Sequence, residues 1–259
     1  MTDLTGKVAI VTGAARGQGA AESVALARAG ATVIAADILP EPAELPAEAE
    51  TGPGVIHYRL LDVSRPEQWA ELAQWTGERF GRVDGLVNNA GIPMRARLPE
   101  ITLADWERAL SVNLTGALLG IQAVLPLMGR GGSIVNVGSA AALTAHYPVA
   151  YTVSKWGLRG LSRVASMELG GRGIRVNSIH PGFIDTPMTA SAPPAFRESN
   201  LLQIPLGRAG TPGDIAPLVV FLISDESSFI SGAEIPIDGG QTAHAGAMQI
   251  SEAIRASQA

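Results

Sequence analysis

The chain has 259 residues, of which 46% are hydrophobic and 17% are charged, and its formal net charge is −5. This composition excludes a disordered chain, and it argues against a nucleic-acid-binding protein, which normally gathers a basic excess on one face. Cysteine is absent and the four histidines show no metal-ligand spacing, so thiol catalysis, disulfides and a dedicated metal site are not expected.

We also expect neither export nor membrane insertion. Residues 1–7 have no apolar core of the kind that directs secretion. The longest apolar run outside Gly and Ala, residues 215–223, is far shorter than the ~18 residues that span a bilayer. The sequence therefore favours a cytoplasmic protein without a membrane partner, and the absence of cysteine fits a reducing compartment.

Short apolar runs alternate with longer amphipathic segments along nearly the whole chain. Near-continuous apolar strands are typical of a parallel sheet covered by helices on both faces, so we predict a doubly wound α/β sheet. A last strand at 233–237 contains Pro236, which cannot donate to a strand ladder, and is therefore expected at the sheet edge. The clearest other strands lie at residues 8–11, 33–36, 86–87 and 134–137.

Helix starts and irregular segments divide these runs. Ser64 and Glu67 have the spacing of a capping box, and Thr211 precedes a proline at a first helical position. The proline-rich segment 38–54 predicts at most a short helix. Segment 183–207 shows no clean periodicity, and a loop of that length is usually functional, often a lid.

The first strand runs into a glycine-rich turn at residues 12–19, which a helical pattern follows. Glycines let the backbone turn sharply, and the helix amino terminus offers N–H groups to a diphosphate. Asp37, at the end of the second strand, favours a dinucleotide site over an ordinary strand–helix turn. The glycines at 13, 17 and 19 form GxxxGxG, whereas the usual fingerprint is GxGxxG.

Further motifs follow this turn in a fixed order: Asn88-Asn89-Ala90-Gly91, Asn113, Ser139, Tyr151-Thr152-Val153-Ser154-Lys155 and Arg175-Val176-Asn177-Ser178-Ile179-His180-Pro181-Gly182. With them the chain resembles the classical short-chain dehydrogenase/reductases over about residues 4–240. Its closest likeness is to the bacterial 3α(20β)-hydroxysteroid dehydrogenase branch. The resemblance implies one Rossmann-type domain over residues 1–259, with about seven strands, a lid at 183–207 and a tail at 241–259.

The resemblance also implies a nicotinamide cofactor. A carboxylate at Asp37 would accept from the ribose 2′-hydroxyl and repel a 2′-phosphate, which favours NAD, whereas Arg16 in the turn is typical of enzymes that use NADP. We expect NAD. The implied cofactor contacts are Gly13, Arg16, Gly17, Gln18, Gly19, Asp37, Asp62, Val63, Asn89, Ala90, Gly91, Tyr151, Lys155, Pro181, Gly182 and Thr186.

Tyr151 and Lys155 are four residues apart, so on a helix they share one face. A free tyrosine has a pKa near ~10, too high for a base at neutral pH. A nearby ammonium and an oxidised nicotinamide would stabilise its phenolate, so we expect Tyr151 as the acid/base and Lys155 as its electrostatic partner. We expect Ser139 to orient the substrate oxygen, and Asn113, by resemblance, to order a water. Tyr147 has no lysine four residues on and is not expected to be catalytic.

The expected pocket walls, residues 93–97, 143–147 and 183–206, are mainly apolar, which favours a bulky ketone or secondary alcohol. Arg95 and Arg97 are candidates for an anionic group, and His146 is expected at the surface. The alternatives are an NADPH-dependent 3-oxoacyl-carrier-protein reductase, a non-catalytic nicotinamide sensor, and epimerisation or dehydration on the same fold.

An apolar stripe within 158–169, formed by Leu158, Leu161, Ala165 and Leu169, is expected to extend beyond the core. The resemblance implies that such helices pair across a two-fold axis in a homotetramer. In the tail, Met248, Ile250 and Ile254 predict a short amphipathic helix against a neighbouring subunit, with disorder as the alternative.

Overall fold

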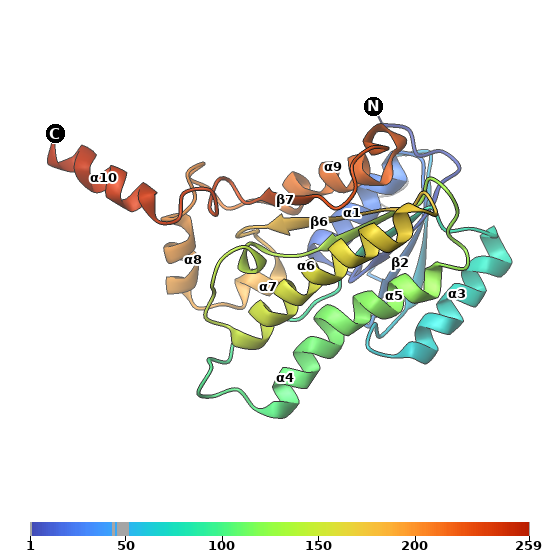
Figure 1. Cartoon of the computed structure of the whole chain (residues 1–259), viewed down its shortest axis with the longest axis horizontal. Coiled ribbons are helices and arrows are strands. Elements are labelled where there is room, and N and C mark those ends of the chain that lie inside the picture. Colours follow the sequence, from blue (N-terminus) through green and yellow to red (C-terminus); the bar gives the residue numbers. More distant parts are fainter. Residues whose placement is uncertain (1, 43–44, 46–51, 259) are drawn as a thin grey trace.

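Seven strands form a single parallel sheet in the order β3-β2-β1-β4-β5-β6-β7 (Figure 1). The computed structural model describes residues 2–42, 45 and 52–258. The predicted doubly wound sheet is confirmed, and so is the edge position of the strand that contains Pro236. The strands are β1 Val8–Thr12, β2 Thr32–Asp37, β3 Val55–Leu60, β4 Gly85–Asn88, β5 Ser133–Val137, β6 Arg175–Pro181 and β7 Glu234–Ile237.

Helices cover both faces of the sheet: α1 and α9 pack on one face, and α3, α5 and α6 pack on the other. Side chains of each strand alternate between the two layers. Ile10 therefore packs on the side of α3, α5 and α6, while Ala9 and Val11 pack on the side of α1 and α9. The helices are α1 Gly17–Arg28, α3 Pro66–Phe80, α4 Leu103–Leu110, α5 Gly116–Val124, α6 Val149–Gly170, α7 Pro187–Ala190, α8 Pro194–Leu201, α9 Pro212–Ile223 and α10 Ala247–Ser257.

The two predicted helix starts have different outcomes. α9 begins at Pro212, as expected, and the Asp214 carboxylate accepts from the backbone N–H of Thr211 at 2.7 Å and from its hydroxyl at 2.8 Å. The predicted capping box at Ser64 is wrong. Helix α3 begins at Pro66, and the Ser64 hydroxyl donates to Asp62 at 2.6 Å, because that carboxylate is closer than the first helical turn.

The expected exposed stripe on α6 is also wrong, because its residues belong to the core. Leu158 is 2% exposed, and Ala165 and Leu169 are buried against the sheet. A second apolar stripe, one that sequence reading did not single out, lies on the outer face of this helix and consists of Val153, Trp156, Val164 and Met167.

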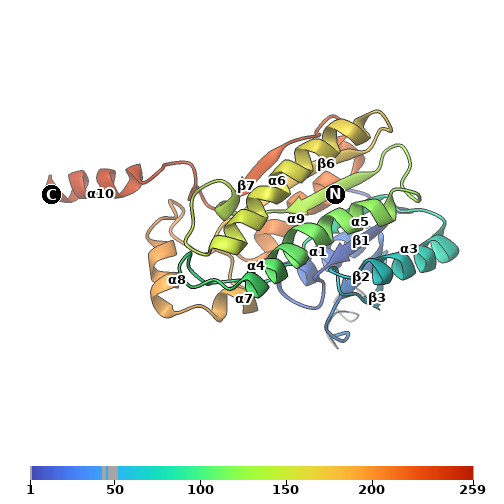
Figure 2. The ribbon, with the colours of Figure 1, turned by 60° about the horizontal axis from the view of Figure 1, so that its bottom comes forward.

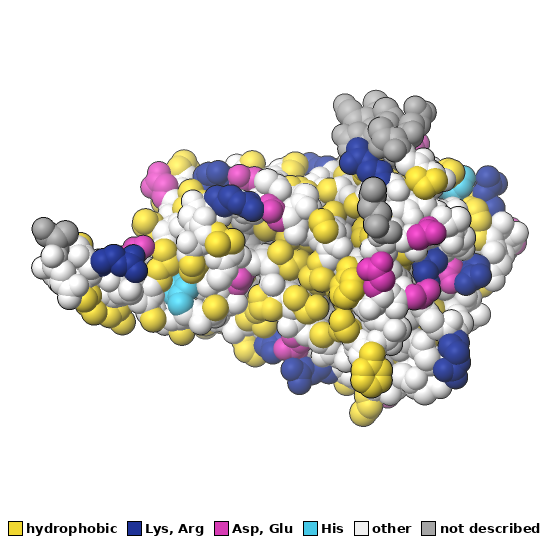
Figure 3. All heavy atoms as spheres, turned by 90° about the horizontal axis from the view of Figure 1, so that it is seen from above, with side chains coloured by type: hydrophobic (Ala, Val, Ile, Leu, Met, Phe, Trp, Pro, Cys, Tyr) yellow, Lys and Arg dark blue, Asp and Glu magenta, His cyan; other side chains and the backbone are white. Residues whose placement is uncertain are grey.

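The irregular segments resolve into short helices. Segment 183–207 contains α7 and α8, while residues 43–44 and 46–51 of segment 38–54, where a short helix was predicted, lie outside the described residues. The tail forms α10, which extends away from the rest of the chain in two views (Figures 1 and 2) and projects from the surface in a third (Figure 3). Within the described part of the chain, no helix combines the length and the apolar character needed to cross a membrane.

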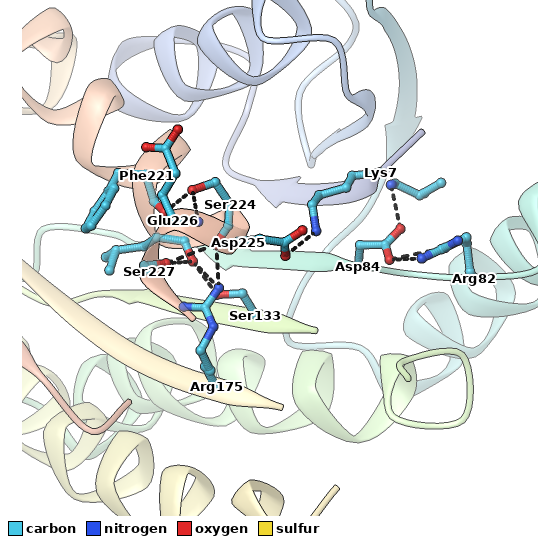
Figure 4. Close-up of polar contacts among 12 residues, drawn as sticks. Lys7, Arg82, Asp84, Ser133, Arg175, Phe221, Ser224, Asp225, Glu226 and Ser227 are labelled. Atoms are coloured by element: carbon cyan, nitrogen blue, oxygen red, sulfur yellow. Dashed lines mark hydrogen bonds and ion pairs between the residues drawn. The ribbon is translucent and has the colours of Figure 1, made fainter. Parts of the chain in front are cut away.

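Polar contacts tie together the amino-terminal edge of the sheet (Figure 4). Asp84, just before β4, accepts from the Val8 backbone N–H at 2.9 Å and pairs with Arg82. Arg175, the first residue of β6, donates to the carbonyl oxygens of Leu222 and Ser224 at 2.9 Å. The Asp84 contact holds the start of β1 beside β4, and the Arg175 contacts fasten the start of β6 to the end of α9.

Candidate active site

A cavity of about 620 Å³ lies at the carboxyl-terminal edge of the sheet. It spans the point between β1 and β4 where the strand order reverses, which is where ligands bind in open α/β sheets. Most of the expected site residues line it: Gly13, Arg16, Gly17, Gln18, Asp37, Asp62, Val63, Asn89, Ala90, Gly91, Tyr151, Lys155 and Thr186.

The remaining expected residues lie around this cavity rather than on its lining. Gly19 packs beneath the turn against the Gly13 carbonyl. Gly182 faces Asp238, where an added Cβ would approach its Cα to 2.8 Å. Asn113 accepts from the lining residue Ile92, Ser139 bonds to the lining residue Tyr151, and Pro181 ends β6.

The glycine-rich turn leaves room and donors for a phosphate group. Gly13 has a φ of 68° and Gly17 a φ of 62°, which favour glycine. An added Cβ at Gly13 would lie 2.9 Å from the Cα of Ala90, so a larger residue does not fit. Arg16 precedes α1 and supplies no side-chain cap to the first turn, and the buried Oε1 of Gln18 has no hydrogen-bond partner. The free N–H donors at this turn fit the oxygens of a dinucleotide diphosphate, which accept hydrogen bonds.

Asp37 lies at the far end of the same cavity. Its carboxylate accepts from the backbone N–H groups of Ala15 and Leu39, each at 3.0 Å. These bonds fix the carboxylate at the end of β2, beside the turn. Asn89 fastens the turn from the other side, because its Nδ2 donates to the Thr12 carbonyl at 2.9 Å.

Tyr151 and Lys155 lie one turn apart near the start of α6, with the Lys155 ammonium 5.9 Å from the centre of the Tyr151 ring. The ammonium donates to the Val137 carbonyl at the end of β5, at 2.8 Å. Burial lowers the pKa of Lys155 to about 8. Burial also raises the pKa of Tyr151, whereas a hydrogen bond from Ser139 lowers it by a smaller amount. A phenolate at neutral pH therefore needs further positive charge in the cavity.

Asn113 is buried in a π-helical turn between α4 and α5. Its Oδ1 accepts from the Ile92 N–H at 2.8 Å, and its Nδ2 donates to the Ser154 hydroxyl at 3.1 Å. A Cβ added at Gly91 would lie 3.4 Å from this Oδ1 and 3.6 Å from the Lys155 nitrogen. Asn113 and Lys155 therefore flank Gly91.

Ser139 follows β5 in extended backbone and caps a short 3-10 turn, Ala140–Ala142. Its hydroxyl oxygen accepts from the Ala141 N–H at 3.1 Å. Because that bond uses a lone pair, the hydroxyl proton remains available for donation, as in the hydrogen bond to Tyr151.

Aromatic rings join the segment before α6 to the segment 183–207. The ring of Phe196 lies 5.9 Å from both His146 and Phe183. Arg95 donates to the Met188 carbonyl at 2.8 Å, and the Arg97 guanidinium lies 4.9 Å from the Tyr147 ring. His146 was expected at the surface, but it packs in this cluster, where burial lowers its pKa.

Several lining residues were not found by sequence reasoning. Ile38 and Leu39 follow Asp37, and Arg108, Ser111 and Val112 come from α4 and its π-helical continuation. The first two adjoin a recognised position and could have been inferred from it. The α4 residues carry no local signal, because only the packing of α4 beside the sheet brings them to the cavity.

Comparison with known proteins agrees with this geometry. The family model described as enoyl-(acyl carrier protein) reductase matches residues 13–242. The chain is 44% identical to the trans-4-hydroxycyclohexanecarboxylate dehydrogenase of Sinomonas cyclohexanicum, over 92% of this chain and 93% of that one. The chain belongs to the short-chain dehydrogenase/reductase family. As a member it is an oxidoreductase that acts on an alcohol or ketone of a small-molecule substrate with NAD(H) or NADP(H).

Two further relatives of this dehydrogenase/reductase are equally similar. It is 44% identical to the 3-alpha-(or 20-beta)-hydroxysteroid dehydrogenase of Mycobacterium tuberculosis, over 93% of this chain and 91% of that one. It is also 44% identical to the 3-oxoacyl-(acyl-carrier-protein) reductase of Thermotoga maritima, over 92% and 98%. Equal identity to enzymes with three different substrates means that identity alone does not select the substrate.

Proposed function

We propose that this enzyme is an NAD-dependent dehydrogenase of bulky, largely apolar cyclic secondary alcohols, such as alicyclic alcohols, terpenoids or hydroxysteroids. The observation that carries the proposal is the shared cavity, which Tyr151, Lys155 and Asp37 all line. Asp37 ends β2 and Lys155 bonds to the end of β5, with β1 and β4 between these two strands. Two of the relatives above are named for cyclic alcohols, which favours this substrate class.

In this proposal the bound nicotinamide supplies the hydride acceptor for oxidation and the donor for reduction. Tyr151 takes the hydroxyl proton of the alcohol during oxidation and returns it during reduction. The Lys155 ammonium stabilises the phenolate and holds the ribose, while Ser139 donates its hydroxyl proton to the substrate oxygen. Asn113 orders a water that carries the proton from Lys155 to solvent.

Cofactor selection rests on Asp37 in this account. Its carboxylate is held by two backbone N–H groups at the cavity wall, where it would accept from a ribose 2′-hydroxyl and repel a 2′-phosphate. Arg16 lines the same region and is exposed, so solvent screens its attraction for a phosphate. Thr186 caps α7 and lies close to Gly17, which supports a contact between Thr186 and the cofactor.

The substrate would lie against the aromatic cluster, whose rings join the segment before α6 to the segment 183–207, and we propose that the segment 183–207 acts as a lid. The rings of His146, Tyr147 and Phe196 offer an apolar surface to a cyclic substrate. Arg95 bonds the lid itself, and Arg97 stacks on a ring, so these arginines are used in holding the pocket walls.

We propose further that the enzyme assembles as a homotetramer. The outer stripe of α6, with Trp156 47% and Met167 74% exposed, offers an apolar face that a second copy would cover. Helix α10 would pack on a neighbouring subunit through Ile250 and Ile254, which are exposed. Sedimentation of wild type beside Trp156→Glu tests the first contact: the variant is expected to sediment as a smaller species.

The function is tested by following reduced nicotinamide from NAD and, in parallel, from NADP. The panel should contain trans-4-hydroxycyclohexanecarboxylate, 3α-hydroxysteroids, terpenoid alcohols and aryl secondary alcohols. Turnover of a cyclic alcohol with NAD is the expected result. Arg16 and one of the relatives favour the alternative, a 3-oxoacyl-carrier-protein reductase. Faster reduction of a 3-oxoacyl group on its carrier protein with NADPH would replace the present proposal by that alternative.

A further inference from the structure

His180 is a buried histidine that the proposed reaction does not use. It lies near the end of β6, is 0% exposed and pairs in the sheet with Pro236 of the edge strand. Its Nδ1 is 3.2 Å from the Ser139 carbonyl oxygen, and its Nε2 is 3.1 Å from the Ser178 hydroxyl.

These partners define the tautomer of the ring. A carbonyl oxygen only accepts hydrogen bonds, so Nδ1 carries the proton and donates to Ser139. The other nitrogen then accepts from the Ser178 hydroxyl. Burial lowers the pKa of His180, which keeps this neutral tautomer at neutral pH.

The ring also occupies the space beside Gly138. An added Cβ at this glycine would lie 2.5 Å from Nδ1 and 2.7 Å from Cε1 of His180. The Gly138 N–H donates to the Ile179 carbonyl at 2.7 Å, so β5 and β6 stay joined up to the residue before Ser139. His180 therefore packs against the backbone of Gly138 and donates a hydrogen bond to the carbonyl of Ser139.

The other end of the Ser139 turn is held from α6 and β7. Arg159 donates through Nη1 to the Ala142 carbonyl at 2.7 Å. The same guanidinium pairs with Glu234 through two bonds of 3.1 and 2.7 Å, and Glu234 also pairs with Arg163. The turn between His180 and Arg159 thus has a fixed carbonyl at each end.

We infer that His180 is a positioning residue for Ser139, fixing the backbone of the catalytic turn so that the Ser139 hydroxyl faces Tyr151 and the substrate oxygen. The inference rests on the proposed function of Ser139. His180 does not touch the reactants. It acts through the carbonyl of Ser139, and a displacement of about 1 Å at a reacting group can lower a rate by roughly 100-fold.

The test replaces His180 by Phe, which keeps a ring but removes the donor, and by Asn, whose Nδ2 can take the place of Nδ1. We expect His180→Phe to lower kcat by roughly 10–100-fold, with the Kd of NAD nearly unchanged, and His180→Asn to recover most of the loss. His57→Phe is the matched control. His57 lies on β3, away from the Ser139 turn, and its ring packs against Trp75 and Phe80 of α3. Full kcat in His180→Phe would overturn the inference.

A double-mutant comparison separates positioning from general damage. In a Ser139→Ala background, His180→Phe should change the residual kcat by less than about 3-fold, because the residue that it positions is gone. An undiminished loss in that background would overturn the inference. If His180→Phe does not fold, Ser178→Ala takes its place, with a smaller expected loss of kcat and the same dependence on Ser139.

A readout without turnover distinguishes this inference from the proposed function. Imidazole nitrogen NMR of the wild-type enzyme should show His180 as the Nδ1–H tautomer. The opposite tautomer would overturn the positioning contact even in an active enzyme. Wild-type enzyme that shows the expected tautomer but oxidises no alcohol with NAD would instead contradict the proposed function.

Discussion

The two edges of the sheet differ in how many hydrogen-bond partners their buried charged groups have. At the amino edge, Asp84 meets a backbone N–H and an arginine, and Arg175 donates to two carbonyls (Figure 4). At the carboxyl edge, the Lys155 ammonium has three donors, yet among the described residues its one hydrogen-bond partner is the Val137 carbonyl. The Gln18 carbonyl oxygen there has none.

This difference separates stability from function. At the amino edge Asp84 is paired within the chain and holds the start of β1, while Arg175 binds two carbonyls at the end of α9 through Nη2 and, among the described residues, has no partner at Nη1. The carboxyl edge retains unused donors and an acceptor where a ligand can meet them, and it keeps a desolvated ammonium that the folded chain alone does not fully stabilise. Function built on such a residue lowers stability, a common trade-off at active sites.

Tyr151→Phe at the carboxyl edge is expected to have the largest effect. Loss of the acid/base should lower kcat by roughly 10²–10⁴-fold while NAD binding, followed by tryptophan fluorescence, persists. Tyr147→Phe, four residues earlier and before the start of α6, should lose far less kcat. Comparable turnover in Tyr151→Phe and wild type would remove Tyr151 as the acid/base.

Lys155→Met should separate activity from stability at the same edge. The variant loses the cation beside Tyr151, so we expect kcat to fall by roughly 100-fold, since one charge of this kind shifts a pKa by about 1–3 units. Its Tm at pH 7 should be equal to or higher than that of wild type, because a desolvated ammonium is removed.

The pH dependence of that Tm difference has a definite sign. The pKa of Lys155 is about 8 in the folded chain and 10.5 in the unfolded chain, so folding disfavours its charged form. The penalty is complete below about pH 8 and disappears as the pH rises from 8 to 10.5. Thermal unfolding of both proteins should therefore show a gap that narrows in this window. A gap that widens there would contradict the burial argument.

Asp37→Ser should change the cofactor preference without stopping the chemistry. Loss of a charged hydrogen-bond acceptor is worth about 1.5–3 kcal/mol, or roughly 10–100-fold in the ratio of kcat/KM for NAD to that for NADP. Arg16→Ala is the companion variant, expected to leave the preference for NAD in place. An unchanged ratio in Asp37→Ser would show that this carboxylate does not contact the ribose.

Asp84→Ala tests the amino edge. The Val8 N–H would lose its buried acceptor, which should lower the free energy of unfolding by about 1–3 kcal/mol in chemical denaturation. Asp84→Asn keeps an acceptor oxygen and should lose less. Both variants should retain wild-type kcat per folded molecule, and a large fall in kcat would mean that the two edges are coupled.

Sequence reasoning reached most of the fold because its signals are local. Buried strands read as apolar runs, and the glycine turn and the Tyr151–Lys155 pair depend only on spacing along one element. Sequence reasoning failed where contacts with residues elsewhere in the fold determine which side chains are buried or hydrogen-bonded. Both stripes of α6 are apolar, so only packing shows that Leu158 is inside and Trp156 outside. Ser64 has a capping spacing, but Asp62 takes its hydroxyl. Arg108 reaches the cavity through the placement of a whole helix.

The central claim, that the carboxyl edge holds positive charge for a Tyr151 phenolate, can be measured directly. The chain has three tyrosines, so Tyr58→Phe/Tyr147→Phe leaves Tyr151 as the sole one, and its tyrosinate absorbance can be titrated once this variant is shown to retain turnover. The account predicts a Tyr151 pKa above the ordinary value in the free enzyme, because of burial, and a clear fall when NAD binds. A pKa that NAD leaves unchanged would contradict it.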